Sequence, residues 1–224
     1  MVAGTACSLI LRSAYQIETL MNSQTIRDKF GDDFLADDHT FKLGIDHRFT
    51  KHIAHRFRRR NVLETCTGAG FTTIALARVA TGVTTVEINP SHLEQARQNL
   101  KIASFGDNVT FILGDILDEG ILKKLPSVDS AFIDPDWADT ESGHEYHFIN
   151  SNTKPPADTL LERIFRITEN VALIAAPYID TREFEGLPKN ERELLYLGES
   201  HELFCLYFGS LISTLGETEF RVHI

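Results

Sequence analysis

The sequence has few cysteines and no long apolar run. Cys7, Cys66 and Cys205 lie far apart, without the spacing of a metal site or a disulfide framework. This usage is typical of a reduced, cytoplasmic protein with buried thiols, and we expect that location. No run approaches the roughly 20 residues of a membrane span. The short apolar patch near the N-terminus has no charged leader before it, so we expect no signal peptide.

An excess of positive charge is also lacking. The formal net charge is −10, which argues against a protein that coats nucleic acid by charge alone. Residues 42–60, KLGIDHRFTKHIAHRFRRR, are an exception because they hold seven Lys or Arg and one acid. Two interpretations stay open for this basic segment. It is either a solvated helix face or a local binding patch for an anionic substrate such as RNA or a nucleotide.

A strong metal motif is absent as well. His47, His52 and His55 fall in the basic segment, and His144 and His147 lie in the stretch GHEYHF. Neither set has a zinc spacing with a third ligand. We therefore expect no metal and interpret these histidines as surface or substrate-loop residues.

From residue 61 onward, short β-rich runs alternate with helix-like segments. The runs are 61–65, 83–88, 108–113, 128–133 and 170–176, and they are followed by a hairpin-like pair at 193–200 and 201–212. Alternation of this kind predicts an α/β, Rossmann-like fold with a mostly parallel sheet, here of seven strands with an antiparallel C-terminal hairpin. Residues 218–224 could be a last strand or a tail. We expect a helical N-terminal extension over 1–60 and one domain over 61–224.

The stretch VLETCTGAGFTT (62–73) has the order strand, glycine turn and helix start. Gly68 and Gly70 let the backbone turn tightly and approach a ligand at a helix N-terminus. A dinucleotide fingerprint would carry a third glycine where Thr73 stands, and the Glu64 carboxylate would repel a pyrophosphate. A cationic ligand suits Glu64 better, and S-adenosylmethionine carries both a sulfonium and an ammonium group.

Acids also end the next two strands. Glu87 follows the second strand and can accept hydrogen bonds from both hydroxyls of a ribose. Asp115 ends the third strand, where an adenine amino group would need an acceptor. Single acids at such places are usually helix caps or turn residues. Because parallel strands bring these ends to one edge of the sheet, the acids together predict a nucleoside site.

With LETCTGAG, VEINP, GD and DPDW in this order, the chain resembles the class I S-adenosylmethionine-dependent methyltransferases. It is most similar to the trimethylguanosine synthase family of RNA-cap guanine-N2 methyltransferases, over roughly residues 40–212. DPDW stands where that family has a serine or aspartate, two prolines and an aromatic residue. ITENVALIAAPYID resembles its fifth-strand segment, LFCLYFGSLI its closing strand, and DHRFTKHIAHRF its lead-in helix.

The resemblance implies roles for two sets of residues. Those expected to hold the cofactor are Glu64, Thr65, Gly68, Gly70, Glu87, Ile88, Asp115, Ile116 and Asp134. Those expected to form the methyl-accepting, catalytic site are Asp134, Pro135, Asp136 and Trp137. In the second set the aromatic ring stacks on the guanine, and Asp134 accepts hydrogen bonds from its exocyclic amine.

Three departures from the family pattern surround the substrate rather than the cofactor. Asp136 replaces the second proline, Ala138-Asp139 replaces glycines, and Pro177-Tyr178-Ile179 replaces a Pro-Arg-Asn-like stretch. Asp136 could favour an amine-bearing acceptor or take up a proton. Other aromatic residues that could line the acceptor pocket, or simply pack in the core, are Phe41, Tyr146 and Phe148. Pro155-Pro156 is interpreted as loop punctuation.

The sequence therefore predicts a methyltransferase that transfers a methyl group from S-adenosylmethionine to a nitrogen of a planar acceptor, with the guanine exocyclic amine of RNA as the first candidate. The alternatives are a methyltransferase that acts on a small molecule or a protein, and a non-catalytic S-adenosylmethionine-binding protein. A dinucleotide-dependent oxidoreductase is a more distant alternative. The oligomeric state is left open.

Overall fold

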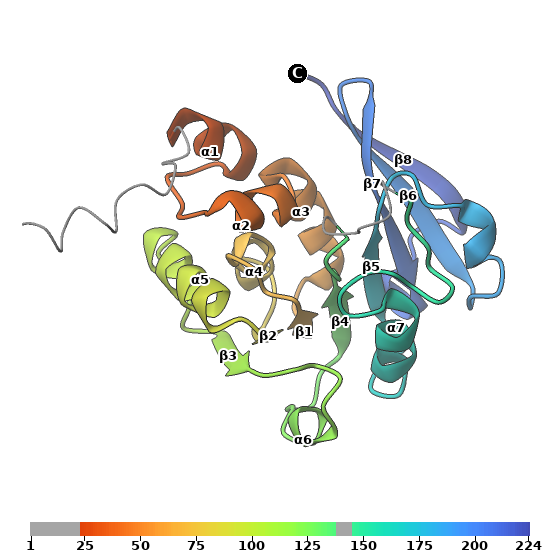
Figure 1. Ribbon diagram of the computed structural model, residues 1–224, viewed down its shortest axis with the longest axis horizontal. Helices are drawn as coiled ribbons and strands as arrows, with labels where there is room; N and C mark the ends of the chain where they lie inside the picture. The colour runs from red at the N-terminus through yellow and green to blue at the C-terminus, as the bar shows by residue number, and fades with distance from the viewer. Residues whose placement is uncertain (1–22, 138–144) are drawn as a thin grey trace, which may run out of the picture.

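The computed structural model describes residues 23–137 and 145–224 (Figure 1). The helices are α1 (Ser23–Phe30), α2 (Asp38–Leu43), α3 (His47–Ala54), α4 (Phe71–Ala77), α5 (Pro90–Ile102), α6 (Glu119–Leu122) and α7 (Ala157–Phe165), with short 3-10 helices η1 (His55–Phe57), η2 (Thr181–Phe184) and η3 (Gly209–Leu211). The strands are β1 (Asn61–Thr65), β2 (Gly82–Glu87), β3 (Val109–Leu113), β4 (Ser130–Ile133), β5 (Val171–Ala175), β6 (Asn190–Leu197), β7 (Ser200–Phe208) and β8 (Gly216–Val222).

The strands form one sheet in the order β3-β2-β1-β4-β5-β7-β6-β8. The first five are parallel, and β7 is antiparallel to both β5 and β6. The α/β, Rossmann-like class and the antiparallel C-terminal hairpin are thus confirmed. The sheet has one strand more than the seven predicted, because β8 pairs in parallel with β6. The chain runs outward from β1 to β3 on one side and returns through β4 on the other, so the order reverses between β1 and β4.

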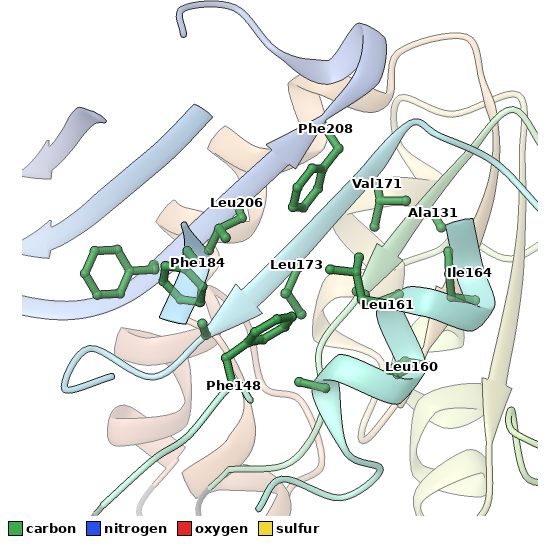
Figure 2. Close-up of a cluster of buried hydrophobic side chains, with 14 of the residues drawn as sticks. Ala131, Phe148, Leu160, Leu161, Ile164, Val171, Leu173, Phe184, Leu206 and Phe208 are labelled. Carbon is green, nitrogen blue, oxygen red and sulfur yellow. The ribbon is translucent and has the colours of Figure 1, made fainter. Parts of the chain in front are cut away.

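The two faces of the sheet are covered by different helices. On one face, Leu63 and Leu173 pack with Leu160 and Ile164 of α7, as Figure 2 shows for part of this cluster. The other face packs against α3 and α4. A central strand that is buried on both sides favours continuous apolar residues. A carboxylate at the end of such a strand is therefore surrounded mainly by apolar side chains.

The N-terminal helices pack against the helical layer that begins after the glycine loop. Phe30 of α1 stacks on Phe71 at the start of α4, with ring centroids 3.6 Å apart. Helix α2 begins with a capping box, in which the Asp37 carboxylate accepts from the Thr40 amide at 2.8 Å. Gln95 of α5 donates to the same Asp37 side chain at 2.8 Å. Helix α2 is therefore fixed against α5, close to the carboxyl ends of the parallel strands. A boundary at residues 60 and 61 stays a prediction.

No helix among the described residues is long and apolar enough to cross a membrane.

Candidate cofactor and acceptor site

A cavity of about 510 Å³ opens at the carboxyl ends of β1, β2, β3 and β4. This is the place where open α/β sheets bind ligands, beside the reversal in strand order, and the volume lies within the roughly 300–1,000 Å³ of ligand pockets. The residues predicted from the sequence that line it are Glu64, Gly68, Glu87, Ile88, Asp115, Ile116, Asp134, Pro135, Asp136 and Trp137. The structure thus brings to one cavity the whole predicted acceptor set and all of the predicted cofactor set except Thr65 and Gly70.

The two glycines of the loop have different roles in the structure. Gly68 has φ +54°, and a Cβ added there would meet no atom within 4 Å, so the backbone faces open space beside the cavity. Gly70 has φ +82°, and a Cβ there would lie 2.8 Å from the Ala96 Cβ of α5. Gly70 and Thr65 are not among the residues that line the cavity. Gly70 therefore serves the close packing of α4 against α5.

Glu64 is a buried carboxyl at the end of β1, with 1% of its surface exposed. The Thr73 hydroxyl donates to one of its oxygens at 2.6 Å, so the residue at the third-glycine position orients this acid. Burial raises the pKa of Glu64 to about 7, despite that hydrogen bond. The charge of Glu87 acts in the same direction as burial. A cation beside Glu64 would favour its ionised form.

Glu87 and Asp115 are held by backbone groups at the ends of β2 and β3. The two Glu87 carboxylate oxygens accept from the amides of Gly68 and Asn89, each at 2.9 Å. This carboxylate therefore ties the glycine loop to the end of β2. Asp115 is exposed, and its side chain accepts from the Leu117 amide at 2.8 Å. Each acid is fixed in place and keeps acceptor capacity toward the cavity.

The DPDW stretch leaves β4 along the cavity wall. Burial raises the pKa of Asp134 well above its ordinary range, and the charges of Asp136 and Glu64 add to this shift. Asp136 pairs with Lys154 through two backbone hydrogen bonds of 2.9 and 2.8 Å, which fix the course of the stretch. Trp137 is half-buried and packs edge-to-face on Tyr146, at 5.7 Å and 84°. Tyr146 thus sets the plane of the indole.

A second cavity of about 390 Å³ lies on the other side of this wall. Trp137, Leu43, Gly44 and Ile45 line both cavities. Phe41 lines the second one, so its predicted place near the acceptor site is consistent with the structure, although its ring also packs on Phe30. Trp137 therefore lies at the junction between the two cavities.

Several residues at the cavity were missed by sequence reasoning. His39 of α2 and His92 of α5 line it, as do Lys154, Pro155 and Pro156 of the loop before α7. The prolines thus contribute to the wall besides ending a loop. Asn89 has a signal that could have been used, since it follows Glu87 by two residues and caps α5. The two histidines have none, because only the packing of α2 against α5 brings them together.

Other candidates lie outside the cavity. Phe148 is a core residue packed on Phe184. His147 pairs with Glu183 at 3.0 Å on the surface, and His144 lies outside the described residues. Within residues 23–137 and 145–224, no group of three His, Cys, Asp or Glu side chains is arranged to hold a metal ion.

Part of the basic segment is neutralised inside the protein. The Arg48 guanidinium makes two hydrogen bonds to Asp46, and Arg56 makes two to the buried Glu191. These two arginines are therefore paired within the protein, whereas the sequence interpretations were a solvated helix face or a binding patch. The cations of the segment that stay exposed are Lys42, Lys51, Arg58 and Arg59.

The fold and the site are those of the class I S-adenosylmethionine-dependent methyltransferases. The model of the RNA cap guanine-N2 methyltransferase family matches residues 59–184, and the chain belongs to this family. The matched range includes the glycine loop and the DPDW stretch.

Three known proteins with similar sequence or fold carry methyltransferase names. Catechol O-methyltransferase of Mycobacterium tuberculosis is 42% identical over 85 residues, which is 34% of this chain and 36% of that protein. A Porphyromonas gingivalis W83 protein assigned as a methyltransferase has a TM-score of 0.69 at 15% identity, over 85% of this chain and 48% of that one. The Thermus thermophilus 16S rRNA N2 G1207 methyltransferase, in complex with AdoMet and guanosine, has a TM-score of 0.53 at 14% identity, over 78% and 43%. The chain thus spans less than half the length of these relatives.

Proposed function

We propose that this protein methylates the exocyclic amine of guanine in RNA. The observation that carries the proposal is Trp137, whose indole is held by Tyr146 at the junction of two cavities, three residues after the half-buried Asp134. A ring in this place can stack on a nucleobase and leave one edge of the base facing Asp134. The family match and the likeness to a guanosine-bound N2 methyltransferase support this acceptor.

We propose that the cofactor occupies the larger cavity, and the residues present fit it. Glu64, buried and with a raised pKa, favours a cationic group at the methionine end. Glu87 keeps acceptor capacity on both oxygens for a ribose, and the exposed Asp115 can accept from an adenine amino group. The open space beside Gly68 admits a ligand against the backbone. S-adenosylmethionine supplies an electrophilic methyl group on its sulfonium sulfur.

At the acceptor, the protein has to orient a weak nucleophile. The lone pair of an aromatic amine is delocalised into its ring, so charge develops on nitrogen only as the methyl group is transferred. Oxygen acceptors that hold the amine hydrogens fix the nitrogen and stabilise this charge. Asp134 is assigned this role. Stacking on Trp137 fixes the plane of the base, and such stacking contributes about 1–3 kcal/mol per base.

The experiment is methyl transfer from labelled S-adenosylmethionine to a short guanosine-containing RNA. Trp137→Ala should keep the affinity for S-adenosylmethionine and lower transfer to RNA by at least about tenfold, because 1.4 kcal/mol corresponds to a factor of ten. Trp137→Phe is the matched control, since it keeps an aromatic face and should retain most of the transfer. Normal methylation by the alanine variant would contradict the acceptor site.

O-methylation of a catechol is the second candidate, favoured by the 42% identity over 85 residues to catechol O-methyltransferase. A planar catechol could stack on Trp137 in the same way as a base. The two candidates are separated by the same labelled assay with RNA and catechol as parallel acceptors. Transfer to catechol without transfer to RNA would replace the first proposal by the second.

A further inference from the structure

A pair of titratable side chains meets at the mouth of the cavity. The His39 Nε2 atom lies 3.6 Å from the Asp136 Oδ2 atom, at ion-pair distance. The two come from separate elements, α2 and the stretch after β4, and both line the cavity. The Asp136 side chain is 18% exposed and that of His39 is 44% exposed. The pair therefore runs from the cavity wall toward solvent.

The position of His39 is fixed by the packing of α2. Asp37 caps this helix and receives a hydrogen bond from Gln95 of α5, so α2 cannot turn independently of α5. The His39 ring stacks on that of His92, also on α5, with centroids 5.3 Å apart and planes at 22°. Two contacts to α5 thus direct His39 toward Asp136.

Asp136 is equally constrained on its own side. Its amide and carbonyl are both paired with Lys154, so the backbone that carries its carboxylate is held on the opposing loop. A proline, which the family pattern has at this position, would lack the amide that donates to Lys154. This chain thus has a carboxylate and a histidine partner where the pattern has an apolar ring.

Other charged and titratable groups line the same cavity or adjoin α2. They are Asp37 before α2, His92 on α5, Glu64 and Cys66 at the end of β1, Glu87 and Asp115 at the ends of β2 and β3, Asp134 along the same stretch, and Lys154 on the opposing loop. Acids outnumber cations among these groups.

We infer that His39 and Asp136 take up the proton that the acceptor loses on methylation and pass it to solvent. The acceptor atom forms a bond to the methyl carbon while the carbon–sulfur bond breaks, with its electron pair staying on sulfur. The acceptor then releases its N–H or O–H proton to Asp136, and His39, the more exposed partner, delivers it to water. The inference rests on the proposed methyl transfer but not on guanine, since an amine and a catechol each lose one proton.

The test is the dependence of kcat on pH at saturating S-adenosylmethionine, with guanosine-containing RNA and catechol as separate acceptors. In the wild type, kcat should rise with pH, because the pair can take up the acceptor's proton only in its deprotonated form. His39→Asn should remove this rise and lower kcat about 10- to 100-fold near pH 7, with the acceptor KM changed little. Saturation with S-adenosylmethionine separates this effect from the ionisation of Glu64, which acts on cofactor binding.

Two further variants sharpen the result. Asp136→Asn should lose the same pH dependence of kcat. The double variant His39→Asn/Asp136→Asn should have a kcat no lower than that of the slower single variant, because the effects of residues that act as a unit are not additive. His223→Asn is the matched control, an exposed histidine at the C-terminal end of the chain, and should leave the profile unchanged.

An unchanged profile in His39→Asn, or full additivity in the double variant, would overturn the inference while leaving the proposed methyl transfer intact. Transfer to catechol alone would overturn the guanine proposal instead, and the profiles measured with catechol would then decide the role of the pair. Transfer to neither acceptor by the wild type would contradict the proposed function and this inference together.

Discussion

The ionisation of the buried Glu64 carboxyl predicts how the affinity for S-adenosylmethionine depends on pH. Its pKa of about 7 in the free protein means that near neutral pH it is only partly ionised. A cationic ligand favours the ionised form, so binding releases a proton and tightens as the pH rises. Between pH 6 and 8, the affinity for S-adenosylmethionine should increase by up to about tenfold, because the ionised fraction of a group with this pKa increases by that factor. Titration calorimetry in buffers of different ionisation enthalpy measures both the affinity and the proton release.

The control is a neutral isostere at the same position. In Glu64→Gln, the affinity for S-adenosylmethionine should lose most of its pH dependence. Asp115→Asn should bind S-adenosylmethionine more weakly, with the pH dependence of the wild type. S-adenosylhomocysteine, which lacks the sulfonium charge, should show a smaller change with pH than S-adenosylmethionine. An equal pH dependence for the wild type and Glu64→Gln would show that another group is responsible.

Individual site residues were predictable where one strand end determines their place. Glu64, Glu87 and Asp134 each stand at or just after the end of a β-rich run, and parallel strands bring such ends together. His39 and His92 were not predictable, because their contact depends on how α2 packs on α5. A histidine on a short helix has no pattern that shows which way it faces.

At the element scale, the glycine loop allows a matched pair of substitutions. Both Gly68 and Gly70 have positive φ, so alanine costs roughly 1–2 kcal/mol of backbone strain at either position. At Gly70 the new Cβ would also meet the Ala96 Cβ at 2.8 Å and push α4 from α5. Gly70→Ala should therefore lower the free energy of unfolding by about 2–4 kcal/mol, and Gly68→Ala by less. Urea unfolding measures the difference, and equal losses would contradict the packing role.

The elements themselves differ in how far the sequence determines them. Strand β1 was predicted with its observed bounds, since four of its five residues are buried and the glycine turn marks its end. Strand β8 lies at the edge of the sheet and alternates between exposed and half-buried residues, so its pattern is close to that of a tail. Helix α2 has six residues, too few to show a helical period.

At the scale of the whole molecule, charge is distributed unevenly. The net charge is −10, and an acid-rich cavity fits a cationic cofactor better than a polyanion. An RNA acceptor therefore needs cations outside the cavity. The internal pairing of Arg48 and Arg56 removes two of those in the basic segment and leaves the exposed ones, among them Lys51 and Arg58. The sequence could not identify the pairing of Arg56, because its partner Glu191 lies far along the chain.

The exposed cations give the prediction that belongs to this scale. Contacts with phosphates release counterions, so each one adds to the salt dependence of binding without regard to base sequence. The double variant Lys51→Ala/Arg58→Ala should weaken binding of a guanosine-containing RNA and reduce the slope of log K against log salt by about 2. Lys124→Ala, an exposed cation outside the basic segment, is the control and should change neither quantity. Fluorescence anisotropy at several salt concentrations measures both. An unchanged slope in the double variant would mean that residues 42–60 serve the fold, and that any RNA acceptor is held by the two cavities around Trp137.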